Sequence, residues 1–325
     1  MTVRTRVLLI SDTHGEAFNI RNEHKVDVVI HCGDLTDQSK LYEYHSTLKL
    51  LKELNAPLTL VIAGNHDFTL DTPAFERKVL EATDSLDPEL VRKEYGDIGA
   101  ARRLFDDTPG VTFLDEGTHK FNLHNGAYLS VYASPFTPSQ GGGAFQYRPN
   151  TGHRFTIEQD TDIVITHGPP RGIMDRTCEG RAGCPNLFAA IARARPRLHC
   201  FGHIHEEWGA RRIAWRSPTA ETPSHFTSID NEASTTIDTL RNIKQMTTDS
   251  PEKRVDKLNR MEQHRRQGYC AASCRYEDRG AYTLFVNAAM EGVTEEFPMH
   301  PPWIVDIDLP LSSQGPGTHV ELRIP

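Results

Sequence analysis

Short, fully apolar runs that end abruptly in polar, glycine-containing segments recur along the chain. The first covers residues 7–10 and stops at Ser11-Asp12, and four later runs end in the same way, at 28–30, 58–63, 163–165 and 198–201. Runs of this length without alternation are typical of strands that are buried on both faces of a parallel sheet. The pattern therefore predicts five buried strands, each followed by a polar loop.

The segments between these runs have the spacing of helices. Helices are expected over about 38–54, 73–82, 88–105 and 185–195. Asp71-Thr72-Pro73 has the cap-plus-proline form of a helix start. Strands that alternate with helices indicate an α/β fold with a largely parallel sheet.

The middle of the chain and its last third depart from this alternation. Residues 111–133 contain three short β patterns, and Asn125-Gly126 predicts a hairpin between the last two. A β-like run covers 210–215, and strand patterns return at 283–287 and 303–307. The interval 217–280 loses its periodic apolar character, and it is interpreted as a partly mobile insertion with a helix over about 237–267.

Charge and hydropathy exclude several classes of protein. The 325 residues include 36 Lys+Arg and 44 Asp+Glu, which gives a net charge of −8. This acidity gives no general reason to expect nucleic acid or an anionic membrane as a partner. No apolar run reaches the roughly 18 residues of a membrane-spanning helix, and the N-terminus lacks a secretory pattern. We expect a cytoplasmic protein, with the nucleus as an open alternative.

The six cysteines are expected to be reduced thiols. Cys270 and Cys274, with His264 nearby, have a spacing that would also suit a metal, but no second cysteine pair completes such a site. The lysines and arginines between 241 and 266 are more typical of a solvated helical face than of a binding patch.

The chemistry of the chain is concentrated in the loops after the five strands, where ligands bind in open α/β sheets. Their donors are carboxylates, imidazoles and one carboxamide, a mixture that suits Mn, Fe or Zn better than a cysteine-rich structural zinc site does. Each residue alone is typical of a cap or a solvated side chain, but their recurrence at five strand ends favours one site. They are Asp12, His14, Asp34, Asn65, His66, His167, His203 and His205.

Five motifs in this order resemble those of the calcineurin-like metallophosphoesterase superfamily. The resemblance covers roughly residues 5–215 and resumes at 282–309. The chain is most similar to the metallophosphoesterase-domain-containing, class III cyclic nucleotide phosphodiesterase-like group, some mammalian members of which have glycine where this chain has His203. The motifs are Asp12-Thr13-His14, Gly33-Asp34, Gly64-Asn65-His66-Asp67, His167 and Gly202-His203-Ile204-His205.

The resemblance implies a four-layer α/β/β/α sandwich. Asp12 and His205 would have to meet at one metal, so we expect a single domain over 1–325, with 217–280 as an insertion on its scaffold. The β-rich middle would supply the second sheet.

The resemblance also implies a centre with two divalent metal ions, Mn²⁺ first and Fe, Zn or Mg as alternatives. A hydroxide between the two ions would attack phosphorus, His66 would protonate the leaving oxygen, and the Asp37 carboxylate would orient His66. The first ion would be held by Asp12, His14, Asp34 and His205, and the second by Asp34, Asn65, His167 and His203, with Asp34 bridging.

The function expected from this centre is hydrolysis of a small phosphodiester, with a cyclic nucleotide as one option. A phosphomonoesterase, a nuclease of the same superfamily and a metal-bound, non-catalytic regulatory scaffold remain as alternatives. Ser/Thr protein phosphatases continue the Gly-Asp motif with Arg-Gly, whereas this chain has Leu35-Thr36. The loop over 134–148, with Phe136, Phe145 and three glycines, is equally consistent with a flexible connection and with a wall of the substrate cleft. The oligomeric state is left open.

Overall fold

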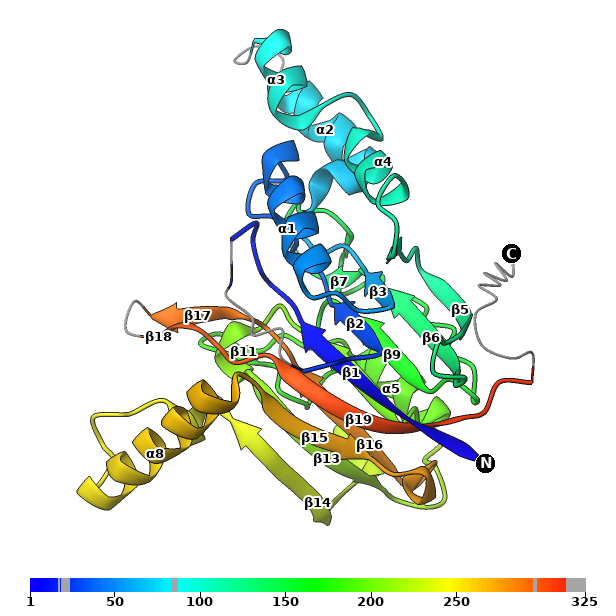
Figure 1. Cartoon of the computed structure of the whole chain (residues 1–325), viewed down its shortest axis with the longest axis vertical. Coiled ribbons are helices and arrows are strands. Elements are labelled where there is room, and N and C mark those ends of the chain that lie inside the picture. Colours follow the sequence, from blue (N-terminus) through cyan, green and yellow to red (C-terminus); the bar gives the residue numbers. More distant parts are fainter. Residues whose placement is uncertain (17, 19–23, 83–86, 295–296, 314–325) are drawn as a thin grey trace.

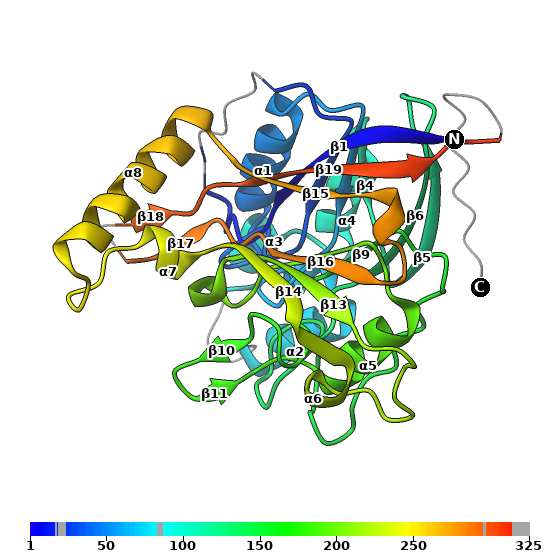
Figure 2. The same cartoon turned by 90° about the horizontal axis from the view of Figure 1, so that it is seen from below.

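The computed structural model describes residues 1–16, 18, 24–82, 87–294 and 297–313, and the rest of the expected domain, 314–325 included, lies outside the described residues. Two large sheets face each other (Figures 1 and 2). In order across the first sheet, the strands are β15 (Cys270–Cys274), β19 (Trp303–Pro310), β1 (Thr2–Ile10), β2 (Val28–His31), β3 (Leu58–Val61) and β4 (Val111–Phe113).

The second sheet has seven described strands. The hairpin predicted at Asn125-Gly126 joins its strands β5 and β6, and the patterns at 283–287 and 303–307 place one strand in each sheet, as expected. In order the strands are β14 (Ile229–Thr239), β13 (Gly209–Trp215), β16 (Tyr282–Asn287), β12 (Leu198–Phe201), β9 (Ile163–Thr166), β6 (Tyr128–Ser134) and β5 (Gly117–Asn122).

Helices cover the outer faces of both sheets. On the first sheet lie α1 (Leu41–Glu53) and α4 (Ala100–Asp106), and on the second lies α5 (Pro185–Ala194), so Figure 2 shows four layers from α1 to α5. Strand β1 explains the uniformly apolar runs: Val7 and Leu9 face the other sheet, while Leu8 and Ile10 pack on the helix side. Both faces of the strand are buried, which confirms the four-layer α/β/β/α prediction.

Two expected helices differ from the structure. The helix expected over 88–105 is two helices, α3 (Pro88–Tyr95) and α4, because Gly96 and Gly99 have φ angles of 76° and 79° and end the helical path. The helix expected over 237–267 is two helices, α7 (Leu240–Ile243) and α8 (Pro251–Gln267), and its first residues belong to strand β14 (Ile229–Thr239).

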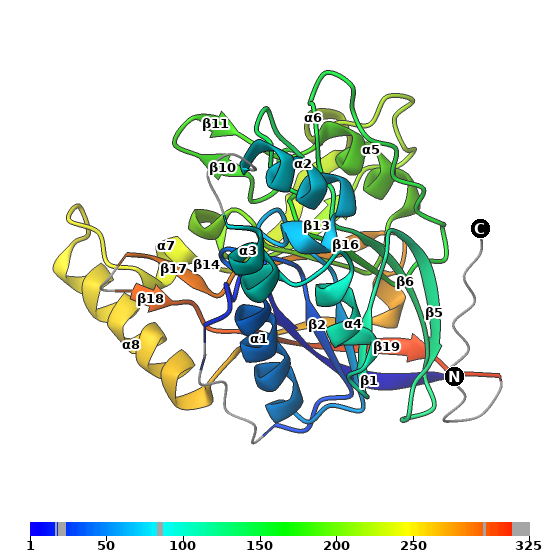
Figure 3. The ribbon, with the colours of Figure 1, turned by 90° about the horizontal axis from the view of Figure 1, so that it is seen from above.

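The interval 217–280 is more integrated than the insertion expected from the sequence. It adds an edge strand to each sheet, β14 beside β13 and β15 beside β19. Helix α8 stands at the side of the sandwich (Figures 2 and 3), and its basic face is solvated apart from Lys257, which is buried in an ion pair of 2.7 Å with Asp249. These elements give no periodic apolar pattern in the sequence, because edge strands and an exposed helix need few apolar residues.

The alternative metal site at Cys270 and Cys274 is not assembled. Cys270 Sγ lies 2.8 Å from His264 Nδ1, while the Cys274 thiol points to the Arg197 carbonyl, 3.4 Å away. Among the described residues neither cysteine belongs to a group of three metal-ligand side chains, and all six cysteines are free. No helix in the described part of the chain has the length and hydropathy to cross a bilayer.

Candidate metal centre

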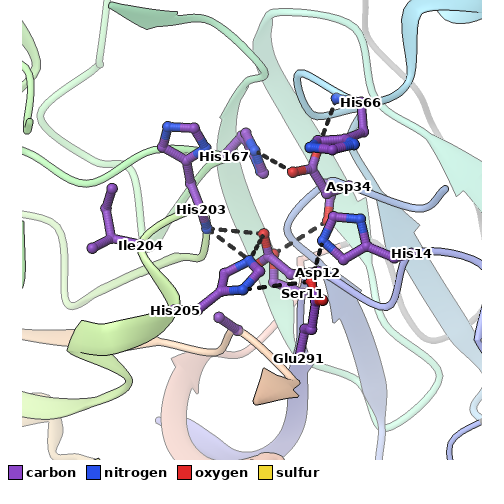
Figure 4. A network of polar contacts seen from close by, with 12 residues as sticks. Ser11, Asp12, His14, Asp34, His66, His167, His203, Ile204, His205 and Glu291 are labelled. Carbon is purple, nitrogen blue, oxygen red and sulfur yellow. Dashed lines mark hydrogen bonds and ion pairs between the residues drawn. The ribbon is translucent and has the colours of Figure 1, made fainter. Parts of the chain in front are cut away.

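The carboxyl ends of strands from both sheets meet at one place and bring the predicted ligands together (Figure 4). Asp12 and His14 follow β1, Asp34 follows β2, His167 follows β9, and His203 and His205 follow β12. Within each of two groups the ligand atoms lie within 4.8 Å of one another. The groups are Asp12, His14 and His205, and Asp34, His167 and His203. His14, Asp37 and His66 form a third group at the same spacing, and it shares His14 with the first.

Asn65 joins the second group through His167. The Nε2 atom of His167 lies 2.9 Å from the Asn65 Oδ1 atom and 3.2 Å from Asp34 Oδ2. The structure groups Asp34 with His167 and His203, so its expected bridging of both ions stays a prediction.

Four of these residues hold left-handed backbone conformations that are unfavourable for residues with a side chain. The φ angles of Asp12, His14, Asp34 and His203 are 52°, 49°, 51° and 70°. Each such residue costs about 1 kcal/mol or more relative to glycine. The concentration of this strain in the loops after β1, β2 and β12 indicates that the loops are shaped for ligand placement rather than for stability.

Glycine is required where two of these loops approach each other. A Cβ atom on Gly64 would collide with the Asp34 carboxylate, and one on Gly202 would collide with the Asp12 carboxylate. The glycines before Asn65 and His203 therefore leave room for the two buried carboxylates.

Main-chain carbonyls fix the tautomers of two ligand histidines. The Nδ1 atom of His167 donates to the Cys32 carbonyl at 3.0 Å, and Nδ1 of His14 donates to the Thr36 carbonyl at 3.2 Å. Each Nε2 atom is then left to face the ligand carboxylates, and its lone pair becomes available to a metal ion once the ring is neutral. Because carboxylate oxygens and imidazole nitrogens converge here within 4.8 Å of one another, the residues fit a divalent transition-metal ion.

In the metal-free protein, protonated histidines pair with the buried carboxylates of this centre. Burial alone would lower the pKa of His167, but the Asp34 carboxylate raises it to about 9 and is itself held to a pKa of about 2. His205 is raised in the same way to a pKa of about 9 by Asp12, whose own pKa is lowered by His205. His203 is neutral, because burial and the nearby His167 lower its pKa to about 4.

Binding of Mn²⁺ to the metal-free protein is expected to tighten as the pH rises from 6 to 9. His167 and His205, with pKa values of about 9, carry protons at pH 7, and a ligand imidazole must be neutral. Each displaced proton contributes roughly a tenfold gain in affinity per pH unit below its pKa. Calorimetry in buffers of different ionisation enthalpy would count the released protons, and a pH-independent affinity would contradict the assignment.

His203→Gly and His203→Ala are expected to differ in stability although both remove the imidazole. Glycine tolerates a φ of 70°, whereas alanine keeps the strain. The metal-free Gly variant should therefore be more stable than the Ala variant by about 1 kcal/mol in urea unfolding. Equal stabilities, or a more stable Ala variant, would show that the loop relaxes without the strain.

His66 lies beside the ligand groups, and its ring centroid is 4.8 Å from that of His14. Its Nδ1 atom donates to the main-chain carbonyl of Asp37 at 2.7 Å, while the Asp37 carboxylate is 3.6 Å from the same atom. The Asp37 main chain thus holds the His66 ring by a hydrogen bond, and the Asp37 carboxylate lies within ion-pair distance, so the orienting role expected of that carboxylate stays a prediction. Burial lowers the pKa of His66, but Asp34 and the Asp37 carbonyl outweigh it and raise the pKa.

Asp67 was not assigned a role from the sequence, yet it ties two ligand loops together. Its buried carboxylate accepts hydrogen bonds from the main-chain nitrogens of Leu35, Thr36 and Gly64 at 3.0–3.1 and 2.8 Å, and from the Thr36 hydroxyl at 2.7 Å. The loops that carry Asp34 and Asn65 are thereby held in register. Its place in the Gly-Asn-His-Asp motif was the available signal.

Glu291 is a second residue whose place beside the centre is not evident from the sequence. It begins β17 (Glu291–Thr294), and its Oε2 atom lies 3.0 Å from His14 Nε2 and 3.5 Å from His205 Nδ1 (Figure 4). Its main-chain nitrogen also donates to the Asp12 carbonyl at 3.2 Å. No sequence signal identifies it, because it stands outside the strand-end motifs and nearly 280 residues from His14.

The loop over 134–148 is attached to the centre rather than free. The main-chain nitrogen of Ala144 donates to the Asn65 carbonyl at 3.3 Å, and that of Phe145 donates to the Asp71 carboxylate at 2.7 Å. Phe136 stacks on His153, with ring centroids 4.6 Å apart. The loop thus supports the Asn65 loop from outside.

A four-layer sandwich that gathers carboxylate, imidazole and carboxamide donors at its strand ends defines the class of metallophosphoesterases. The chain belongs to the calcineurin-like phosphoesterase family, whose model matches residues 5–207. The resemblance inferred from the five motifs is confirmed.

Similar proteins share this region of the chain. Metallophosphoesterase domain-containing protein 1 of Homo sapiens is 29% identical over 211 residues, which cover 63% of this chain and 62% of that protein. UPF0046 protein T07D4.2 of Caenorhabditis elegans is 29% identical over 215 residues, 63% of this chain and 52% of that protein. Probable rhamnogalacturonate lyase C of Emericella nidulans is 33% identical over 213 residues, 65% of this chain and 18% of that protein. The chain therefore matches only part of the length of each of these relatives.

Proposed function

We propose that the protein is a phosphodiesterase that hydrolyses a small phosphodiester at a centre of two divalent cations, with Mn²⁺ as the preferred ion. The observation that carries this proposal is the pair of ligand groups, Asp12–His14–His205 and Asp34–His167–His203, with Asn65 beside the second. Two groups so close together suit a pair of ions that act on one phosphate. Such ions supply an activated water nucleophile and offset charge on the phosphate oxygens.

The chain's own residues would perform the remaining work. Nε2 of His66 is free to face a leaving oxygen, because Nδ1 is bound to the Asp37 carbonyl. A proton delivered there lowers the barrier to departure of a poor leaving group. The carbonyls of Cys32 and Thr36 hold the His167 and His14 rings so that their Nε2 atoms face the ions.

The proposal is tested by elemental analysis together with two p-nitrophenyl substrates. The purified protein is expected to hold about two equivalents of transition metal and to turn over bis(p-nitrophenyl) phosphate faster than p-nitrophenyl phosphate. A preference for the monoester would indicate a phosphomonoesterase. Metal without turnover of either ester would indicate a regulatory scaffold.

A further inference from the structure

An apolar cleft of about 1550 Å³ opens directly beside the candidate centre. One end of it is lined by Asp37, Asn65 and His66, and the rest lies between helices α2 (Thr72–Ala82) and α3. These helices stand above the sheets in Figure 1. The cleft exceeds the few hundred to about 1,000 Å³ of typical small-molecule sites, so it can hold more than a phosphate and a methyl group.

Both helices turn an amphipathic face into this cleft. On α2 four lining residues, Phe75, Lys78, Val79 and Ala82, follow the i, i+3, i+4, i+7 spacing of one helical face, and Glu76, Leu80 and Glu81 flank them in the lining. The lining residues of α3 have the same spacing: Pro88, Val91, Arg92 and Tyr95.

These faces are not used to build the core. Helix α3 has no buried residue, and in α2 only Ala74 and Phe75 are buried. Leu80 and Ile98 also line the cleft, yet they are 75% and 52% exposed. Apolar faces that cover no core and adjoin a catalytic group are typical of a binding surface.

The wall of the cleft is continuous with the site. Phe68 stands two residues after His66, and its ring lies 5.6 Å from that of Tyr95 and 6.2 Å from that of Phe75. These three rings join the His66 loop to α2 and α3. Because His66 would protonate the leaving oxygen, a substituent on that oxygen points into the cleft.

The charges in the cleft indicate one phosphate rather than several. Lys78 Nζ lies over the Phe68 ring, 4.9 Å from its centroid, and Arg92 pairs with Asp97 at 3.0 Å. Both cations are therefore engaged, and the carboxylates of Asp37, Glu76, Glu81 and Asp97 also line the cleft. The apolar part of the lining is both aliphatic and aromatic. The excess of carboxylates disfavours a second phosphate, and an aliphatic chain needs only the apolar part of this surface.

We propose that the cleft between α2 and α3 binds an aliphatic chain on the leaving group of the phosphodiester substrate. This proposal rests on the proposed function and adds the substrate class to it. The oxygen of water adds to phosphorus and releases one proton to solvent, while the bond from phosphorus to the alkoxy oxygen breaks. The aliphatic chain departs as an alcohol that takes its proton from His66, and His66 regains a proton from solvent.

The first test is the regiochemistry of cleavage of octyl methyl phosphate, followed by ³¹P NMR. We expect methyl phosphate and octanol as products, and kcat/KM at least tenfold above that for dimethyl phosphate. Octyl phosphate and methanol as products, or no gain with the longer chain while bis(p-nitrophenyl) phosphate is hydrolysed, would overturn the cleft proposal and leave the proposed function intact.

Binding separates failure of the cleft from failure of the activity. Octylphosphonate should bind the Mn²⁺-loaded protein at least tenfold more tightly than methylphosphonate in calorimetry. If octylphosphonate binds more tightly than methylphosphonate but no ester is turned over, the cleft assignment stands and the proposed function fails. Equal affinities would overturn the cleft assignment.

Variants on α2 and α3 test whether the preference for the octyl group arises in the cleft. Leu80→Asp places a charge in the cleft at a position that is too exposed to affect folding, and Val91→Asp places one there from α3 at a half-buried position. Both should lose the tenfold preference for the octyl chain. Leu90→Asp, the same kind of change on α3 outside the cleft lining, should keep it. A preference unaltered in Leu80→Asp, or a change of oligomeric state in that variant, would assign the cleft to a protein partner instead.

Discussion

Asp34→Asn is expected to remove bound metal and to lower turnover of a phosphodiester by about a thousandfold. The Asp34 carboxylate is buried, contacts His167 Nε2 at 3.2 Å, and accepts a hydrogen bond from the His66 main-chain nitrogen at 2.9 Å. An amide removes the negative charge that offsets the repulsion of two cations. A loss of about 4 kcal/mol of transition-state stabilisation corresponds to that factor.

The measurement is metal content by elemental analysis beside kcat/KM for bis(p-nitrophenyl) phosphate. Asp106→Asn, the same chemical change at an exposed carboxylate that pairs with Arg102, serves as the control and should match the unaltered protein. Two equivalents of tightly bound metal in Asp34→Asn would rule out the expected bridging role.

His66→Ala is expected to lower turnover by roughly 10²- to 10⁴-fold while metal content stays unchanged, because His66 contributes a proton rather than a ligand. The loss should be largest for an alkyl leaving group, which needs protonation, and small for p-nitrophenolate, which does not. Steady-state rates over a series of leaving groups would show this as a steeper dependence on the leaving-group pKa.

Asp37→Asn is the matched control for that experiment. The His66 ring is held by the Asp37 carbonyl at 2.7 Å, and this main-chain contact survives the substitution, whereas the carboxylate is 3.6 Å away. Turnover should therefore stay within about threefold of the unaltered protein. A loss as large as that of His66→Ala would support the orienting role that the resemblance implied for the Asp37 carboxylate.

The core strands could be predicted from the sequence because their burial leaves a local signature. In β1, Val7, Leu8, Leu9 and Ile10 are all buried, since alternate residues face the other sheet and the α1 layer. Such strands read as uninterrupted apolar runs. Strand β14 has only two of eleven residues buried and has no such signature, so its residues fall in the interval interpreted as an insertion.

The ligand residues were also accessible from the sequence, since each follows a recognisable strand in a short motif. The contacts around these ligand residues were not accessible from the sequence. Glu291 reaches His14 and His205 from a distant segment, and the hydrogen bond that holds the His66 ring goes to a main-chain carbonyl that no residue type reveals. The cleft between α2 and α3 is likewise invisible along the chain, because an amphipathic face that lines a cavity has the same spacing as one that packs on a core.

The order of apolar runs and strand-end motifs by itself determined the family, the four-layer sandwich and the donor atoms of the candidate centre, because local burial and ligand chemistry are written in residue type and spacing. Only the tertiary structure decided which donors share a group, which way each imidazole turns, and where the apolar faces of α2 and α3 lie. These depend on distances between residues far apart in the chain, and such distances exist only once the two sheets have packed.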